Sequence, residues 1–171
     1  HYGLSLGPLL DRGAKLQPTN TIIERVADGY EVITYAEHAR RVAMLANSLS
    51  TLGVQRGDRV ATFCFNTNRH YQAYHAVPSM GFVLHTVNVR LGPNELEYIL
   101  QDAQDRVIFV DQCLLPNLAV VSAGGLASID LGVVVCGPLA CETGPNWRQE
   151  HQEAVLSLES KGCKVLDYDE L

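Results

Sequence analysis

The chain has 171 residues, of which 47% are hydrophobic and 19% are charged, as in an ordinary globular domain and unlike a disordered or fibrous chain. The formal net charge of −6 argues against nucleic acid as a partner, because phosphate binding needs a clustered basic face. No apolar run approaches the roughly 20 residues of a transmembrane segment. The first ten residues also lack the basic and apolar regions of a signal peptide.

The cysteines show no disulfide or zinc pattern. They are Cys64, Cys113, Cys136, Cys141 and Cys163, an odd number without a C-x-x-C pair. A chain of this length buries about 70% of its unfolded surface, so its core requires neither a disulfide nor a metal. We therefore expect free thiols and a reducing, cytoplasmic compartment.

The first part of the chain predicts an extended lead-in over residues 1–20 and a β-hairpin over residues 21–34. Two β-rich runs flank Asp28-Gly29 in the hairpin, and this dipeptide tolerates the positive φ of a tight turn. Both segments precede the first strongly helical pattern.

A helix and a buried strand are predicted next. Thr34 and Glu37 have the spacing of a capping box, and apolar residues then recur every three or four residues as far as Leu52. Gly53 follows as a left-handed C-terminal cap. Residues 60–65 form an apolar run without a polar face, which predicts a strand covered on both sides.

Strands and helices alternate from there on. Helices are predicted at 67–77, 93–103 and 114–122, and strands at 82–87, 107–110 and 131–136. Such an order predicts an α/β fold with a partly parallel, doubly wound sheet flanked by helices, since parallel neighbours need crossover connections.

The chain changes character after residue 136. Residues 137–147 contain two prolines and two glycines and predict a loop, residues 148–161 a charged helix, and residues 164–166 a last strand. We therefore divide the chain into a lead-in at 1–20, a core at 21–136 and an end segment at 137–171.

Four patterns within residues 34–111 carry a family resemblance. They are T-Y-A-E-H…R-G-D-R-V-A (34–61), N-T-N-R-H-Y-Q-A-Y-H-A-V-P-S-M-G (66–81), V-L-H-T-V-N-V-R-L (83–91) and E-L-E-Y-I-L-Q-D-A-Q-D-R-V-I-F-V-D (95–111). In this order and spacing, the chain over residues 20–136 resembles the AMP-forming acyl-CoA ligases of the adenylate-forming superfamily. The third pattern is similar to the branch that acts on medium- and long-chain fatty acids.

The resemblance implies an enzyme that joins a fatty acid to CoA with ATP and Mg²⁺. Members of that family carry, later in the chain, a phosphate loop, an adenine-binding segment, a ribose-binding aspartate and a lysine on a mobile domain. These parts supply the positioning and charge neutralisation that phosphate chemistry needs, and none occurs in residues 1–171. We therefore expect an N-terminal subdomain of a larger ligase that is inactive alone, without a catalytic residue and without a bound cofactor.

Asn88 and Arg90 are the candidates for a ligand contact. They follow the strand predicted at 82–87, at the carboxyl end where parallel sheets place their binding clefts. The resemblance places this turn near the channel for the CoA arm. The structural alternative is that Asn88 turns the chain and Arg90 pairs with a nearby carboxylate.

The histidines and the glycine pair favour structural roles. His70 and His75 are five residues apart, so on a helix they point about 140° apart, and His85 adds no ligand spacing. We predict no metal site. Gly124-Gly125 lacks a following lysine and does not predict a phosphate loop.

Two further groups are also assigned to packing and turns. Tyr71, Tyr74 and Phe82 favour a core face over the wall of a fatty-acid pocket. Asp58 is expected to bond the backbone of its own turn, and Arg59 to remain solvated.

Two other functions stay open at this level. One is a stand-alone flavodoxin-like α/β binding module without catalysis, which the predicted element order also permits. The other is an assembly role, in which exposed apolar surface drives the formation of a homo-oligomer.

Overall fold

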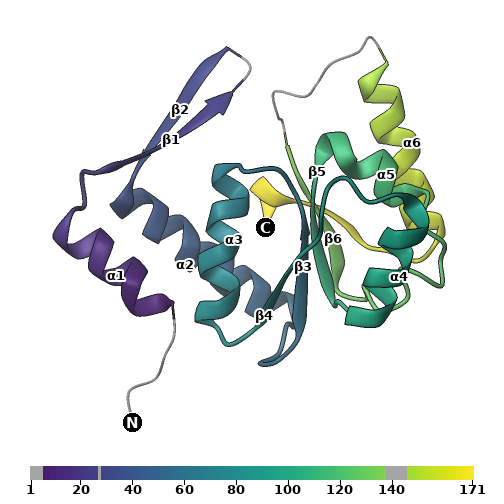
Figure 1. The fold of residues 1–171 in the computed structure, drawn as a ribbon, viewed down its shortest axis with the longest axis horizontal. Coiled ribbons are helices and arrows are strands. Elements are labelled where there is room, and N and C mark those ends of the chain that lie inside the picture. The colour runs from purple at the N-terminus through teal and green to yellow at the C-terminus, as the bar shows by residue number, and fades with distance from the viewer. Residues whose placement is uncertain (1–5, 27, 138–145) are drawn as a thin grey trace.

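A parallel sheet with helices on both faces forms the body of the protein, and a hairpin projects from it (Figure 1). The computed structural model describes residues 6–26, 28–137 and 146–171. It confirms the predicted α/β class, the doubly wound sheet and the N-terminal hairpin. None of the helices in those three ranges is long and apolar enough to cross a membrane.

The elements follow one another in the predicted alternation. The helices are α1 (Gly7–Leu16), α2 (Tyr35–Leu52), α3 (Asn68–Ser79), α4 (Pro93–Ala103), α5 (Leu115–Ala119) and α6 (Trp147–Ser160), with 3₁₀ turns η1 (Gln112–Leu114) and η2 (Tyr168–Glu170). The strands are β1 (Thr21–Val26), β2 (Gly29–Thr34), β3 (Arg59–Phe63), β4 (Val83–Thr86), β5 (Val107–Asp111), β6 (Gly132–Cys136) and β7 (Val165–Asp167).

The main sheet has five parallel strands in the order β4-β3-β5-β6-β7. Numbered from β3, this is the 2-1-3-4-5 order of flavodoxin-like folds. The winding direction reverses at β3, which pairs with β4 on one side and with β5 on the other. The carboxyl ends of β3 and β5 therefore flank the topological switch point, where such sheets place their ligands.

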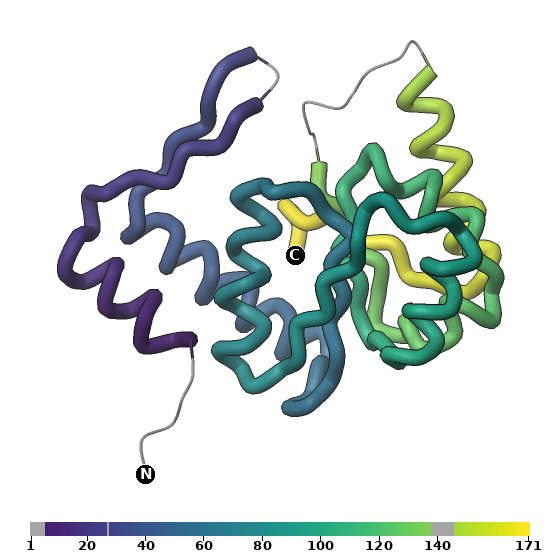
Figure 2. Tube along the Cα trace, in the orientation of Figure 1, coloured from purple at the N-terminus to yellow at the C-terminus, as the bar shows by residue number. Residues whose placement is uncertain are grey.

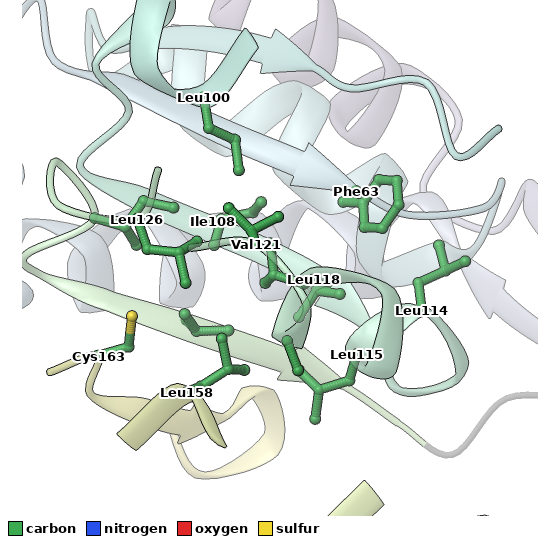
Figure 3. Close-up of a cluster of buried hydrophobic side chains, with 14 of the residues drawn as sticks. Phe63, Leu100, Ile108, Leu114, Leu115, Leu118, Val121, Leu126, Leu158 and Cys163 are labelled. Carbon is green, nitrogen blue, oxygen red and sulfur yellow. The ribbon is translucent and has the colours of Figure 1, made fainter. Parts of the chain in front are cut away.

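The period of two along each strand divides the core between the two faces of the sheet. Phe63 and Val110 point into the cluster covered by α4, α5 and α6, which is drawn in Figure 3. Phe109 and Val134 point into the cluster covered by α2 and α3. Because both faces are covered, the central strands are apolar almost throughout.

The Thr34 and Gly53 caps of α2 are confirmed, but the predicted capping box is only half formed, because the Glu37 carboxylate pairs with Arg40 and Arg41. The Thr34 hydroxyl accepts a hydrogen bond from the Glu37 backbone N–H at 3.1 Å, which satisfies a free donor of the first turn. At the other end, Gly53 has φ 105° and donates its N–H to the last turn, a backbone conformation that strains residues with a Cβ.

The extended lead-in predicted for residues 1–20 is wrong, because residues 7–16 form α1. Pro8 lies in its first turn and Lys15 in its last turn, which are favourable helix positions. Leu10 packs against the cluster under α2 and α3. The sequence carried this signal, since Leu6, Leu9 and Leu10 have helical spacing.

Two other elements differ from the prediction, and one predicted loop is mostly outside the described residues. Gly29 pairs with Val26 and is therefore the first residue of β2 instead of part of the turn. The helix predicted at 114–122 is a 3₁₀ turn followed by a five-residue helix that ends at Ala119. Most of the loop predicted at 137–147, together with Cys141, lies outside the described residues.

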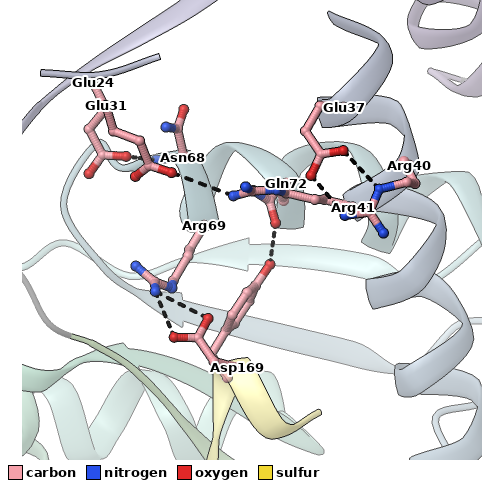
Figure 4. A network of polar contacts seen from close by, with 10 residues as sticks. Glu24, Glu31, Glu37, Arg40, Arg41, Asn68, Arg69, Gln72 and Asp169 are labelled. Atoms are coloured by element: carbon pink, nitrogen blue, oxygen red, sulfur yellow. Dashed lines mark hydrogen bonds and ion pairs between the residues drawn. The ribbon is translucent and has the colours of Figure 1, made fainter. Parts of the chain in front are cut away.

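A polar network ties η2 to α3 (Figure 4). Arg69 pairs with the Asp169 carboxylate at 2.8 Å, and the Tyr168 hydroxyl donates to the Gln72 side-chain oxygen at 2.6 Å. Desolvation by burial raises the pKa of Tyr168, so this hydroxyl stays a neutral donor. These contacts hold the segment after β7 over the α3 side of the sheet.

Candidate functional site at the carboxyl edge of the sheet

The carboxyl ends of four neighbouring strands meet at one edge of the sheet. The backbone N–H of Val87, just beyond β4, donates to the Thr62 carbonyl of β3 at 2.9 Å. Asp111 at the end of β5 pairs in register with Cys136 at the end of β6. This edge includes the switch point, and we take it as the candidate site.

Asn88 and Arg90 lie in the turn that leaves this edge for α4. The Asn88 side-chain oxygen accepts from the Arg90 N–H at 3.0 Å, and its carbonyl accepts from the Leu91 N–H at 3.2 Å. The turn-forming role expected for Asn88 is therefore confirmed. The Arg90 side chain is exposed, and no carboxylate of the described ranges lies within 4.0 Å of it. The ion pair expected in the structural alternative is thus not formed there.

Asp111 is a buried carboxylate at the switch point that the sequence interpretation did not single out. Its side chain has 0% exposure. One oxygen accepts the Phe65 N–H at 2.6 Å, and the other has no hydrogen-bond partner. Desolvation by burial raises its pKa from 3.8 to about 6, against the Phe65 hydrogen bond. Raised pKa values in a cleft are typical of functional positions, although ion-pair networks also produce them.

His70 joins the end of β3 to the start of α3. Its Nδ1 contacts the Phe65 carbonyl at 2.9 Å, and its Nε2 contacts the Thr62 hydroxyl at 3.0 Å. A carbonyl only accepts, so Nδ1 carries the proton and Nε2 accepts from the hydroxyl. Burial lowers the pKa of this imidazole, which keeps it neutral and fixes the loop between strand and helix.

His70, His75 and His85 lie apart and have different partners. His75 Nδ1 contacts His38 Nε2 at 3.1 Å, between α3 and α2. His85 Nδ1 contacts the buried Asp105 carboxylate at 2.8 Å. Burial raises the pKa of Asp105, against its contact with His85. The histidines thus connect elements and do not converge on one point.

The aromatic cluster is only partly a core face. Phe82 is buried at 7% exposure, as predicted, but Tyr71 and Tyr74 are 44% and 42% exposed, so the prediction is wrong for them. The two tyrosines line a hollow of about 270 Å³ between the hairpin and α3, together with Ile22 and Ile23. They face outward because α3 has only one side against the sheet.

The glycine pair lies beside a carboxylate. Ser122 Oγ donates to Glu97 at 2.6 Å and accepts from the Gly125 N–H at 3.1 Å. A Cβ on Gly125 would come within 2.7 Å of the Glu97 side chain. Glycine is therefore required here for close packing against an acidic side chain, an unfavourable setting for a phosphate.

The turn before β3 has one expected and one unexpected contact. The Asp58 carboxylate accepts the Gln55 N–H at 2.8 Å, which confirms its role in the turn. Arg59, expected to be solvated, instead donates to the carbonyls of Ala103 and Gln104 at 2.8 and 2.6 Å. It satisfies free acceptors at the C-terminal end of α4 and carries the positive charge that this end favours.

The described residues at this edge are mainly exposed polar groups and histidines held by structural contacts. Asn88 and Arg90 present an amide and a cation to solvent, while the histidine contacts of the described residues involve threonine, histidine and aspartate but no serine or cysteine nucleophile. Sequence reasoning missed Asp111 because an aspartate that ends a strand also suits a turn. Its one signal was its position directly after four apolar residues.

Comparison with known proteins assigns this fold to a family. The family model described as AMP-binding enzyme matches residues 10–164, a longer stretch than the resemblance at 20–136. Among curated proteins, a long-chain-fatty-acid–CoA ligase of Thermus thermophilus is 45% identical over 134 residues, which cover 77% of this chain and 24% of that enzyme. A medium-chain-fatty-acid–CoA ligase of Ectopseudomonas oleovorans is 31% identical over 68% of this chain and 21% of its own length.

Solved structures share the fold of this chain. A putative long-chain-fatty-acid CoA ligase from Rhodopseudomonas palustris superimposes with a TM-score of 0.66 at 26% identity, over 87% of this chain and 36% of that one. The A-PCP didomain of carboxylic acid reductase from Segniliparus rugosus, solved with AMP, gives 0.77 at 18% identity, over 99% and 26% of the two chains. The chain spans about a quarter of the curated relatives it matches, in their N-terminal portion, and it belongs to the AMP-binding enzyme family.

Proposed function

We propose that this chain is the N-terminal α/β subdomain of an ATP-dependent, AMP-forming fatty-acid–CoA ligase. The observation that carries the proposal is the 45% identity over 134 residues with the Thermus thermophilus long-chain-fatty-acid–CoA ligase. The flavodoxin-like strand order also suits a stand-alone binding module, but the family match across residues 10–164 favours the ligase.

The proposed reaction has two steps. The fatty-acid carboxylate attacks the α-phosphorus of ATP and expels pyrophosphate, which gives an acyl-adenylate. The thiol of CoA then attacks the acyl carbonyl, loses its proton and expels AMP. Bound Mg²⁺ neutralises phosphate charge in such transfers. Fatty acid, ATP and CoA are thus the proposed partners, and the reaction requires polypeptide in addition to residues 1–171.

Within this scheme, Asn88 and Arg90 form part of the wall of the channel for the CoA arm. Three features support this role: their position at the carboxyl edge of the sheet, the exposure of both side chains, and the unpaired Arg90 guanidinium among the described residues. A guanidinium without a protein carboxylate is free to bind a phosphate or carbonyl oxygen of a ligand.

The 171 residues by themselves are expected to be inactive and to hold no cofactor, because they lack the glycine- and lysine-containing loop that binds triphosphates. We also propose a cytoplasmic location, which rests on the free thiols of Cys64, Cys136 and Cys163. A homo-oligomer remains a prediction that light scattering can test.

The test compares ATP–pyrophosphate exchange by the isolated chain and by the product of the complete reading frame. Fatty acids from short to long chain are supplied without CoA. The complete product is expected to exchange pyrophosphate only when a fatty acid is present, and the isolated chain not at all. Absence of fatty-acid-dependent exchange in a folded complete product would contradict the proposal.

A further inference from the structure

Two thiols and one carboxylate converge at the switch point of the sheet. They belong to Cys64, directly after β3, Asp111, the last residue of β5, and Cys136, the last residue of β6. Phe63 pairs with Val110, and Asp111 pairs with Cys136, so the three residues lie at one level on three adjacent strands. Their ligand atoms all lie within 4.8 Å of one another.

Strand alternation directs the three side chains to the same side of the sheet. Phe63 and Val110 point to the α4–α6 side, so the residues that follow them point to the opposite side. Cys64 and Cys136 indeed belong to the cluster under α2 and α3. Exposures are 6% for Cys64, 0% for Asp111 and 1% for Cys136. The three side chains therefore form a buried group with three potential metal-ligand atoms.

One of the three groups has an unused ligand atom. The Asp111 oxygen that does not accept the Phe65 N–H is buried without a hydrogen-bond partner, a costly state for a carboxylate oxygen. The pKa of the Cys64 thiol is raised, first by the adjacent Cys136 sulfur and then by burial. The Cys64 thiol also hydrogen-bonds the Asp111 carboxylate and opposes the rise in its pKa, but the second carboxylate oxygen still has no hydrogen-bond partner.

We propose that Cys64, Asp111 and Cys136 bind a thiophilic divalent cation such as Zn²⁺, with a fourth position left to water. Zinc bonds to thiolate sulfur at about 2.3 Å and to carboxylate oxygen at about 2.0–2.2 Å, in tetrahedral geometry. Two sulfurs on one ion are then roughly 3.8 Å apart, which the observed 4.8 Å limit accommodates with small side-chain movements. The free Asp111 oxygen supplies the third ligand.

Charge balance and chain geometry both favour a cation here. Binding releases the two thiol protons, whose charge equals that of the divalent ion, so the buried site keeps its formal charge. A Cys64–Cys136 disulfide fits less well, because their strands are separated by β5. Two strand spacings are about 9–10 Å, and disulfide-linked Cα atoms are usually within about 7 Å.

The test is a Co²⁺ titration of the reduced product of the complete reading frame, without ATP, CoA or fatty acid. One Co²⁺ per site is expected to give a thiolate-to-cobalt charge-transfer band and the intense visible bands of four-coordinate cobalt. Zn²⁺ should displace it, with two protons released per ion bound to the protein. Because no substrate is involved, the result is independent of the proposed ligase activity.

Three variants and a control complete the experiment. Cys64→Ser and Cys136→Ser should each lower Co²⁺ affinity at least tenfold and weaken the charge-transfer band. Asp111→Asn keeps the shape of the side chain and serves as the test if a serine variant does not fold. It should lower Co²⁺ affinity while the charge-transfer bands of both thiolates remain. The control is Cys163→Ser, a cysteine of 6% exposure on the opposite side of the sheet, which should bind like the parent. A missing band in the folded parent, or Co²⁺ binding by folded Cys64→Ser and Asp111→Asn as tight as that of the parent, would overturn the proposal.

Discussion

Asp111 and His38 are buried ionisable residues whose pKa values shift in opposite directions from their ordinary values. Burial raises the pKa of Asp111 to about 6, so the folded state holds the proton more tightly than the unfolded state. Burial, with His75 nearby, lowers the pKa of His38 to about 4, so the folded state holds the proton less tightly. Their contributions to stability therefore have opposite slopes between pH 4 and 6, and single variants are needed to separate them.

For Asp111, the stabilising contribution is present below the unfolded pKa of about 4 and is lost as the pH rises through about 6. Asp111→Asn keeps an acceptor for the Phe65 N–H and removes the ionisation. We expect the variant to gain roughly 2–3 kcal/mol relative to the parent between pH 4 and 7, at 1.36 kcal/mol per pKa unit.

Urea unfolding at pH 4 and pH 7 with a metal chelator measures this difference. Asp102→Asn, an exposed aspartate on α4, is the matched control and should leave the slope unchanged. A parent and an Asp111→Asn variant with the same pH dependence would show that this carboxylate is not desolvated.

For His38, the stabilising contribution is present above the unfolded pKa of about 6.5 and is lost as the pH falls towards 4. The ring stacks on Tyr71 at 4.7 Å and contacts His75 Nδ1, so its protonation places a charge inside the α2–α3 contact. His38→Gln should remove roughly 2–3 kcal/mol of this acid sensitivity. Unfolding curves at pH 4.5 and 7 check it, with Asn47→Gln on the exposed side of α2 as control.

Arg90 tests the proposed CoA channel. In the complete product, Arg90→Ala should raise KM for CoA about tenfold, equal to about 1.4 kcal/mol of lost contact, while fatty-acid-dependent ATP–pyrophosphate exchange stays unchanged. Arg12→Ala on α1, another exposed arginine, should alter neither quantity. If Arg90→Ala lowered the rate of ATP–pyrophosphate exchange as much as the rate of acyl-CoA formation, Arg90 would not act through the CoA channel.

At the scale of elements, the N-cap of α2 is the clearest local determinant. Thr34→Ala removes the hydroxyl that accepts the Glu37 N–H and should lower the free energy of unfolding by about 1 kcal/mol. Thr51→Ala, on the exposed last turn of the same helix, should change it by less than about 0.5 kcal/mol. Denaturant unfolding of both variants decides whether the cap contributes as proposed.

Elements with strong local signals could be predicted from the sequence, and those that depend on tertiary contacts could not. The capping residue Thr34 and the C-terminal Gly53 define α2 by themselves, and the apolar runs define β3, β5 and β6. In α1, the helical spacing of Leu6, Leu9 and Leu10 was a weak local signal that the prediction overlooked, and the packing of Leu10 against the cluster under α2 and α3 accounts for the helix. For α5, a helix was predicted at 114–122 but its bounds were not, because five residues make little more than one helical turn.

The candidate site was predicted only where its residues are neighbours in sequence. Asn88 and Arg90 share one turn, so the end of a predicted strand pointed to both. Cys64, Asp111 and Cys136 come from three separate segments, and only the register of β3, β5 and β6 brings them together. Spacing rules for metal ligands detect local pairs, so they carried no signal for a site built across strands.

At the scale of the whole molecule, the proposed function assigns this fold one side of a substrate cleft. The winding reverses at β3, the hairpin projects beside α3 in Figure 2, and exposed polar residues line the carboxyl edge. The chain covers 24% of the Thermus thermophilus relative, and phosphate activation by positioning requires groups on more than one side of the nucleotide. A ligase of this family therefore needs this subdomain as architecture and further chain for chemistry.

Product analysis tests that central claim most directly. The product of the complete reading frame is incubated with a long-chain fatty acid, ATP, Mg²⁺ and CoA, and nucleotides and thioesters are separated and quantified by mass spectrometry. The expected result is acyl-CoA and AMP in equal amounts, with formation of both abolished when the fatty acid is omitted. Acyl-CoA formed with ADP instead of AMP, or no acyl-CoA from any fatty acid by a folded protein, would contradict it.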